Sequence, residues 1–331
     1  MINQLIIRNF KSVKDLDMPC KKLNIFIGEP NSGKSNIIEA LSLQSQNAMA
    51  GEGQTMNDQM FRFKTMGDLF YDFNITIPIE VKTDNRHTIL KYAIREDGSP
   101  ENQFNFLLDS EKDADRPTSI SHEGKVLNSG ISGATNVHFY EYKRLSSFSL
   151  DYMPHLSVPY GRNLPSLLLS NPEYKKWVSD FLKSKDLTLT LKPTENEILA
   201  SKLVDDEIYS YPYSSLSETL QRIIFYIIAM KSNKEGIILF DEPESNTFPF
   251  YTKYIAERIA LDETNQFFIT THNPYLLLSL IEKSKKEDLN VCITEMKDYQ
   301  TKVSVLGDDQ ISEVLDLNSD VFFNFDKILG K

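Results

Sequence analysis

The stretch Gly28-Glu29-Pro30-Asn31-Ser32-Gly33-Lys34-Ser35 matches the pattern G-x-x-x-x-G-K-[ST] at every position. It follows the apolar segment 23–27, which is typical of a strand, and precedes segment 35–43, where apolar residues recur with helical spacing. A strand, a glycine-rich turn and a helix are the context in which this pattern forms a phosphate-binding loop. A chance glycine-rich turn is the alternative, and the two flanking elements favour the P-loop.

The residue types of this loop fit the chemistry of phosphate binding. Glycines let successive backbone N–H groups turn inward and cradle phosphate oxygens. Lys34 is predicted to reach the β- and γ-phosphates and Ser35 to ligate Mg²⁺, so ATP and Mg²⁺ are the expected cofactors. The residues of this loop predicted to bind the nucleotide are Asn31, Ser32, Gly33, Lys34, Ser35 and Asn36.

A second apolar segment, 237–240, ends in the carboxylates Asp241 and Glu242. Ligands of open α/β sheets bind at the carboxyl ends of strands. Asp241 is predicted to hold Mg²⁺, and Glu242 to orient or deprotonate the attacking water. The next apolar segment, 266–270, leads to His272, which is predicted to sense the γ-phosphate through a hydrogen bond. A solvated acid pair and a surface histidine are the simpler alternatives; the P-loop favours a catalytic set of Lys34, Glu242 and His272.

The order of the expected elements indicates the fold. Strands alternate with helices at both ends of the chain, which implies a mostly parallel sheet. The middle is different: 75–94 has the pattern of a hairpin, 95–136 is polar and expected to form long loops, and 160–184 contains a helical pattern. Most of the chain separates Lys34 from Asp241, as is normal in ABC-type ATPases but not in Ras-like or RecA-like domains.

The predicted fold class is therefore α/β, a P-loop NTPase of ABC-ATPase type. Its central sheet is expected to be parallel or mixed, with an antiparallel β part and a helical insertion. We expect three segments. They are residues 1–82 with the P-loop, residues 83–210 as the insertion, and residues 211–331 with the acidic strand and the histidine.

These motifs resemble those of the RecF, SMC and OLD-type ATPases. The stretches that carry the resemblance are 5–12 (LIIRNFKS), 33–41 (GKSNIIEAL), 241–244 (DEPE) and 271–277 (THNPYLL). The resemblance implies an ATP-dependent homodimer or higher oligomer. It also implies a signature loop ahead of the acidic strand, for which the best match is 214–222. In this family that loop contacts the γ-phosphate held by a second subunit, and Ser217 is the residue expected to make the contact. An ordinary helix N-cap is the alternative for Ser217.

Some expected family features are missing or altered. The signature loop lacks the paired glycines of transporters, and 245–249 lacks the histidines common in relatives. Gln59 is one candidate among several for the glutamine loop. No heptad array for a long coiled coil is present, and the chain ends near 320–331, where OLD nucleases continue into a Toprim domain.

Composition narrows the choice of location and partner. Hydrophobic residues make up 40% and charged residues 25% of the chain, as in an ordinary globular protein. The formal net charge of −11 disfavours general nucleic-acid binding, which needs Lys and Arg against phosphates. Cys20 and Cys292 lack metal-ligand spacing, so a reduced compartment is expected. The apolar stretch 223–230 is too short to span a bilayer. We therefore expect a cytoplasmic protein without a membrane partner.

Three functions remain as hypotheses at this stage. The first is an ATPase switch that dimerises on ATP and controls a separately encoded effector, with a role in bacterial anti-phage defence that rests on family analogy alone. The second is a RecF-like repair ATPase that clamps DNA, so nucleic acid stays open as a partner. The third is a nuclease or toxin. The histidines that such a site could use have no metal-ligand spacing and are expected to be structural: His87, His122, His138 and His155.

Overall fold

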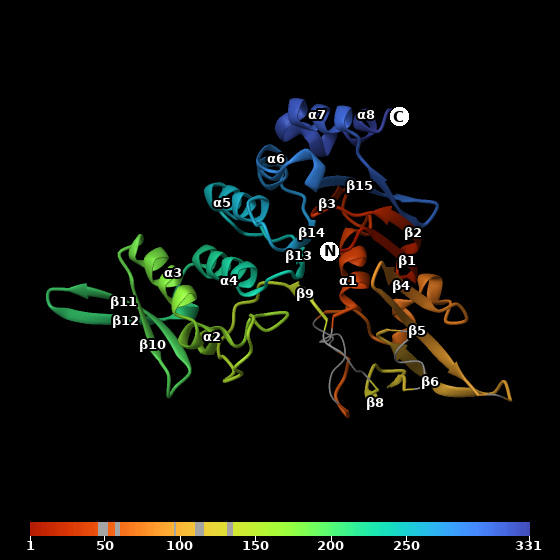
Figure 1. Ribbon diagram of the computed structural model, residues 1–331, viewed down its shortest axis with the longest axis horizontal. Helices are drawn as coiled ribbons and strands as arrows, with labels where there is room; N and C mark the ends of the chain where they lie inside the picture. Colours follow the sequence, from red (N-terminus) through yellow and green to blue (C-terminus); the bar gives the residue numbers. More distant parts are fainter. Residues whose placement is uncertain (46–51, 57–59, 96, 110–115, 131–134) are drawn as a thin grey trace.

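The central sheet brings together strands from both ends of the sequence. The computed structural model describes residues 1–45, 52–56, 60–95, 97–109, 116–130 and 135–331, and within them this sheet has the order β16-β15-β3-β14-β13-β9 (Figure 1). Strands β15, β3, β14, β13 and β9 are parallel, and β16 is antiparallel to β15. Their bounds are β3 (Leu23–Gly28), β9 (Val137–Tyr140), β13 (Ile237–Asp241), β14 (Gln266–Thr270), β15 (Leu289–Lys297) and β16 (Gln300–Val305).

The central strands β3, β13 and β14 are rich in apolar residues because both faces of the sheet are covered. One face, with Leu239 and Phe268, belongs to the core that contains helix α1 and the second sheet described below. The other face, with Ile238 and Phe240, belongs to the core that contains α4, α5 and α6. Figure 1 shows these three helices side by side along the sheet. The helix bounds are α1 (Lys34–Ser42), α4 (Glu218–Ser232), α5 (Pro249–Ala260) and α6 (Pro274–Lys283).

A second sheet is antiparallel throughout and lies beyond α1. In the described part of the chain its order is β2-β1-β4-β5-β6-β7-β8. Its strands are β1 (Gln4–Phe10), β2 (Val13–Pro19), β4 (Ile79–Thr83), β5 (Arg86–Ile94), β6 (Pro100–Leu107), β7 (Thr118–Ser121) and β8 (Val126–Asn128). Two short 3₁₀ helices, η2 (Met66–Leu69) and η3 (Tyr71–Phe73), precede β4. The expected hairpin is formed by β4 and β5, but it starts at Ile79 because Asn74 accepts a hydrogen bond from the backbone N–H of Thr76 and turns the chain.

The expectation of long loops over 95–136 is wrong where β6, β7 and β8 form. Phe104 and Phe106 occupy alternate positions of β6 and are buried, whereas the residues between them are polar. A strand of an antiparallel sheet needs only one apolar face, because the other face of such a sheet can contact water. The abundance of polar and turn-forming residues in this segment hid that alternation.

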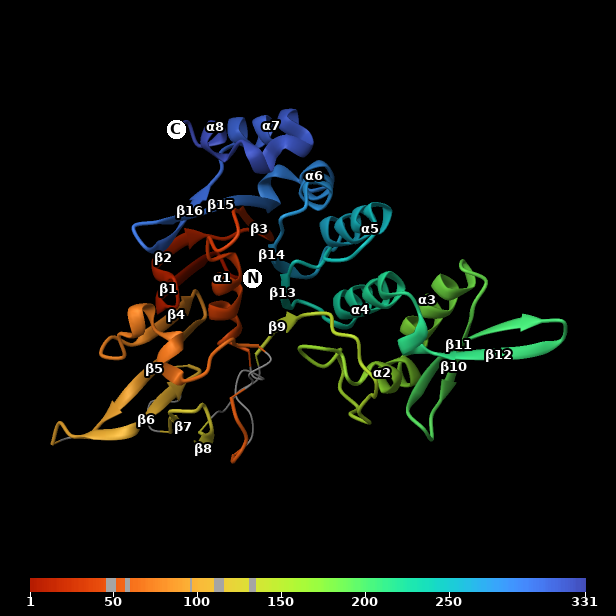
Figure 2. The ribbon, with the colours of Figure 1, turned by 180° about the vertical axis from the view of Figure 1, so that it is seen from behind.

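A third, smaller sheet lies away from the second one, as Figures 1 and 2 both show. It has the order β10-β11-β12 and follows two helices. The elements are α2 (Leu164–Ser170), α3 (Pro172–Lys183), β10 (Thr188–Lys192), β11 (Glu197–Val204), β12 (Glu207–Pro212) and the 3₁₀ turn η4 (Tyr213–Ser215). Every residue of β12 is exposed.

The C-terminal elements cover the end of the helical layer. They are α7 (Asp308–Leu317), η6 (Asn318–Phe323) and α8 (Phe325–Ile328), whereas the short 3₁₀ turn η5 (Lys286–Asp288) lies between α6 and β15. Val314, Val321 and Ile328 anchor them in the core that also contains α6. The predicted mixed α/β class is confirmed, while the division at residues 82 and 210 stays a prediction. Among the described helices, none is both long and apolar enough to cross a bilayer.

Candidate functional site

The P-loop connects the end of β3 to the start of α1, as the sequence motif predicts. Gly33 is the residue before α1 and has φ +94°, a conformation that L side chains rarely adopt. A Cβ atom at Gly33 would lie 1.9 Å from Thr301 Oγ1, so no larger residue fits there. The loop therefore takes its shape from glycine and from close contact with the hairpin β15–β16.

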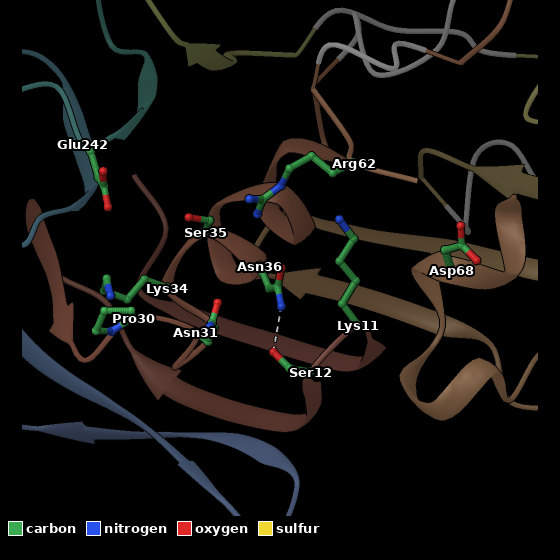
Figure 3. Close-up of a pocket in the computed structure, with 11 residues that line it drawn as sticks. Lys11, Ser12, Pro30, Asn31, Lys34, Ser35, Asn36, Arg62, Asp68 and Glu242 are labelled. Atoms are coloured by element: carbon green, nitrogen blue, oxygen red, sulfur yellow. Dashed lines mark hydrogen bonds between the residues drawn. The ribbon is translucent and has the colours of Figure 1, made fainter. Parts of the chain in front are cut away.

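Hydroxyl groups of the hairpin β15–β16 contact the P-loop and the neighbouring Ser12. Thr294 Oγ1 is 2.7 Å from Ser32 Oγ, and Thr301 Oγ1 is 2.7 Å from Ser12 Oγ. Ser12 Oγ in turn accepts a hydrogen bond of 2.7 Å from Asn36 Nδ2 on α1 (Figure 3). Each contact joins residues from distant parts of the sequence, and together they fix the backbone around the phosphate position.

Lys34 lies over its own loop. Its Nζ donates hydrogen bonds of 2.9 Å to the carbonyl oxygens of Gly28 and Glu29. Burial lowers the pKa of the Lys34 ammonium, and the nearby carboxylates of Glu242 and Asp241 act in the opposite direction. The cation is thus held at the mouth of the loop, where an anionic ligand would be stabilised.

Ser35 and Asp241 come together although 206 residues separate them. Ser35 Oγ donates a hydrogen bond of 3.0 Å to Asp241 Oδ1, and Thr270 Oγ1 donates to the same oxygen. Burial raises the pKa of Asp241, while the hydrogen bonds from Thr270 and Ser35 lower it. A serine hydroxyl beside a carboxylate is the hard oxygen pair that Mg²⁺ prefers, so these residues fit the predicted metal site.

Glu242 and His272 form a second, more exposed pair. Glu242 has φ +47° and its backbone N–H donates to the carbonyl oxygen of Thr270, so the chain turns out of β13 at this residue. His272 Nδ1 lies 3.0 Å from Glu242 Oε1, and the two side chains are 58% and 37% exposed. The predicted base and the predicted sensor therefore touch each other at the open side of the site.

Glu244 lies behind this pair and was not assigned a role from the sequence. Its side chain is 2% exposed and accepts a hydrogen bond of 2.5 Å from Thr271 Oγ1. Burial raises the pKa of Glu244 to about 7, although the bond from Thr271 acts in the opposite direction. The backbone N–H of Asn273 donates to Thr271 Oγ1, so Glu244 supports the loop that carries His272.

Several of the residues described above line a cavity of about 520 Å³, which we call the nucleotide pocket. Figure 3 shows Glu242 on one side of it and Lys11 and Arg62 on the other, with Ser35 and Asn36 between them. The full lining is Lys11, Ser12, Pro30, Asn31, Gly33, Lys34, Ser35, Asn36, Arg62, Asp68 and Glu242. The volume lies within the range of pockets that hold ligands of nucleotide size.

Two cations of this pocket were missed because no local pattern marks them. Lys11 and Arg62 both pair with Glu39, a buried carboxylate of α1. Arg62 Nε donates a hydrogen bond of 2.6 Å to Glu39 Oε1. Lys11 belongs to a stretch that carries the family resemblance, but Arg62 reaches the pocket only through tertiary folding.

Glu141 is a further carboxylate at the same edge. It follows β9, whose last residue Tyr140 is paired with Phe240, so Glu141 and Asp241 leave neighbouring strands side by side. Burial and the charge of Asp241 raise the pKa of Glu141, while Arg62 acts in the opposite direction.

Ser217 lies apart from the other predicted site residues. It is exposed, it is not part of the pocket lining, and its hydroxyl accepts a hydrogen bond from the backbone N–H of Leu220 at the start of α4. The structure thus brings the P-loop, Asp241, Glu242 and His272 together but leaves Ser217 outside. Gln59, a candidate for the glutamine loop, lies outside the described residues.

Comparison with known proteins gives a family match and structural neighbours. The model of the family described as "AAA domain, putative AbiEii toxin, Type IV TA system" matches residues 23–279, more than half of the chain. A crystal structure of an SMC head bound to the C-winged helix domain of ScpA has 15% sequence identity and a TM-score of 0.54, and the match covers 94% of this chain and 99% of that one.

An SMC head from Pyrococcus furiosus, with an extended coiled coil and the C-terminal domain of ScpA bound, is also similar. It has 15% identity and a TM-score of 0.52, and the match covers 95% of this chain and 98% of that one. No match is found among curated proteins. At this level of identity, the matches to the two SMC heads show that the folds are similar.

Proposed function

This chain belongs to the family described as "AAA domain, putative AbiEii toxin, Type IV TA system", and from that premise we propose that it is an ABC-type P-loop ATPase of the SMC/RecF branch that hydrolyses ATP with Mg²⁺ in a site shared by two copies of the chain. The observation that carries the proposal is the contact between Ser35 and Asp241, with Glu242 and His272 beside it. A phosphate cradle, an oxygen pair for a hard cation and a candidate base are the parts that phosphoryl transfer to water needs.

Each residue has a role that follows from its position. The backbone N–H groups at the start of α1 and the ammonium of Lys34 stabilise the charge on the phosphates. Ser35 and Asp241 would hold Mg²⁺, which supplies charge neutralisation to the phosphate oxygens. Glu242 accepts a proton from the attacking water, and His272 holds the Glu242 carboxylate in place.

Ser217 is exposed at the N-cap of α4 and is not among the residues that line the pocket, so we assign its role to a second copy of the chain. In a two-fold dimer, the signature loop of each copy would reach the γ-phosphate bound by the other. Ser217 precedes α4, whose N-terminus favours an anion, so ATP draws the copies together. Hydrolysis removes those contacts, which makes the dimer a switch.

We further propose that this switch controls a separate effector protein. One neighbour by fold, an SMC head, is bound to a domain of another protein, ScpA, and this supports the proposal of a protein partner. The description of the family includes a toxin system. The last part of the proposal is a role in anti-phage defence, which rests on family analogy.

Phosphate release tests the ATPase. Wild type should need Mg²⁺, and Lys34→Ala should lower turnover on the order of 10²–10³-fold, as for the loss of one charge-stabilising donor. Lys91→Ala, an exposed lysine on β5, is the matched control and should leave turnover unchanged. Equal rates for wild type and Lys34→Ala would contradict the proposed function.

Mixing two inactive variants tests the shared site. Neither Lys34→Ala nor Ser217→Arg should hydrolyse ATP alone, but a mixture can form one site from an intact P-loop and an intact signature loop. Partial recovery of turnover is expected. Ser184→Arg, at the exposed C-terminal end of α3, controls for the added charge and should stay active alone. A Ser217→Arg chain that is fully active as a monomer would show that one chain completes its own site.

A further inference from the structure

Segment 141–144 leads from the carboxyl edge of the central sheet, beside Asp241, to the signature loop within a few residues. Glu141, at its start, follows β9 beside Asp241, as described above. Tyr142, the next residue, belongs to the helical side of the molecule, where its ring packs on the first turns of α4. The two neighbours in sequence thus belong to different parts of the structure.

Tyr142 makes three kinds of contact with α4. Its hydroxyl donates a hydrogen bond of 3.1 Å to Gln221 Oε1. The guanidinium of Arg222 lies over its ring at 4.6 Å from the centroid, and the ring of Phe225 meets it edge-on at 5.9 Å. A cation over an aromatic face is attracted by the ring, and more strongly when the cation is desolvated. The side chain of Arg222 is only 10% exposed.

The residues that Tyr142 contacts also hold the signature loop. Gln221 Nε2 donates a hydrogen bond of 2.8 Å to the carbonyl oxygen of Leu216, the residue before Ser217. Arg222 Nε donates a hydrogen bond of 2.9 Å to Glu218 Oε1, the residue after Ser217. The residues on both sides of Ser217 in sequence are therefore tied, through the Leu216 carbonyl oxygen and the Glu218 carboxylate, to the two α4 residues that contact Tyr142.

Arg144 adds a contact from the same segment. Its guanidinium donates to the carbonyl oxygen of Ser214, at the start of the signature loop. The hydroxyl of Tyr213 donates a hydrogen bond of 3.1 Å to the carbonyl oxygen of Gln221, which closes the loop onto α4. Within segment 141–144, Arg144 thus contacts the start of the signature loop, and Tyr142 contacts the α4 residues that hold the middle of that loop.

We propose that Tyr142 and Arg144 are positioning residues for the signature loop, so that adjacent residues of one chain serve the two different ATP sites of the dimer. Glu141 lies beside Asp241 of its own chain, whereas Tyr142 positions the Ser217 that would complete the pocket of the partner copy. This inference rests on the shared site of the proposed function.

The test uses the mixture of Lys34→Ala and Ser217→Arg chains. In its one working site, the Lys34→Ala chain supplies the signature loop and the Ser217→Arg chain supplies the P-loop. Tyr142→Ala added to the Lys34→Ala chain should lower the recovered turnover, on the order of 10²-fold for a misplacement of about 1 Å. The same substitution in the Ser217→Arg chain should leave recovery within about two-fold, because that signature loop is already disabled.

The same substitution in the two chains serves as its own folding control. Tyr142→Phe keeps the ring under Arg222 and loses only the bond to Gln221, so it should cause a smaller loss, again only in the Lys34→Ala chain. Tyr152→Ala, a tyrosine that is 73% exposed, should have no effect in either chain. Equal loss from both chains, or no loss from either, overturns the role of Tyr142. Absence of recovery before Tyr142 is changed overturns the shared site, and the inference with it.

Discussion

The carboxyl edge of the central sheet and the outer sheet β10–β12 use their side chains in opposite ways. At the carboxyl edge, Asp241, Lys34 and Ser35 are each held by hydrogen bonds to residues that are distant in sequence or in the loop. In the outer sheet, Leu203 and Ile208 are 67% and 73% exposed, and β12 has no buried residue.

The carboxyl edge thus holds its side chains in fixed positions, whereas the outer sheet leaves its side chains exposed. A reacting phosphate needs donors that are fixed before it arrives, and burial of the strands behind them provides that rigidity. The outer sheet is joined to the core through β11, where Ile198 and Ala200 are buried, so its outermost strand can change at little cost to the fold. The following predictions test whether the two regions differ as strongly in energy as they do in burial.

The largest effect is expected from Glu242→Gln at the carboxyl edge. Loss of a general base lowers a rate by about 10²–10⁴-fold, whereas the amide keeps the size of the side chain and should preserve ATP binding. Phosphate release and ATP binding are measured on the same preparation. Glu282→Gln, on the exposed face of α6, is the control. Turnover within a few-fold of wild type would mean that another group holds the water.

The core beneath the edge should respond next most strongly. Ile238 on β13 is fully buried, and Ile238→Ala should lower the free energy of unfolding by about 2–5 kcal/mol, from lost burial and the cavity left behind. Urea unfolding followed by circular dichroism measures it. A loss below about 1 kcal/mol would show that the helices on this face close over the cavity.

Glu244 should make stability depend on pH. Its pKa is raised from 4.5 to about 7, so the folded state binds the proton more tightly than the unfolded state. Stability relative to Glu244→Gln should therefore be highest at low pH, fall as pH rises from 4.5 to about 7, and stay low above that. The full difference is at most ~3 kcal/mol. Thermal unfolding of both proteins at pH 5 and pH 8 measures it; a constant difference would mean that Glu244 is ionised at both values.

The smallest effect is expected on β12. Ile208→Ala should change the free energy of unfolding by no more than about 0.5 kcal/mol and leave ATP turnover unchanged, because the side chain is largely exposed. Ile198→Ala, at a buried position of the adjacent strand β11, is the matched comparison and should cost several times more. If Ile208→Ala destabilises as much as Ile198→Ala, β12 is covered by another chain in solution.

The parts of the site that could be predicted from the sequence are those whose residues are consecutive in the chain. The P-loop and the acidic pair at Asp241 need only a local turn and a buried strand, and both patterns are visible without any tertiary contact. Arg62 and Glu141 could not be found in this way. Each reaches the site because another element carries it there, and a single charged residue in a loop or after a strand has no local pattern.

The same reasoning explains which strands were missed. Strands of the central sheet are buried on both faces and read as apolar runs, whereas β12 is exposed on both faces and shows no alternation of buried and exposed positions. The likeness to SMC heads confirms the fold, but the 15% identity leaves the roles of individual site residues as predictions.

The bracing of the P-loop by Thr294 and Thr301 has a consequence for biosynthesis. The loop is made early in translation, yet a strand near the other end of the chain, β15, pairs with β3, and the side chains that lock the loop follow on β15 and β16. A nascent chain still on the ribosome therefore carries a complete P-loop motif without the means to shape it. Because contacts between distant segments form slowly, we expect nucleotide binding to appear only after residue 305 has left the exit tunnel.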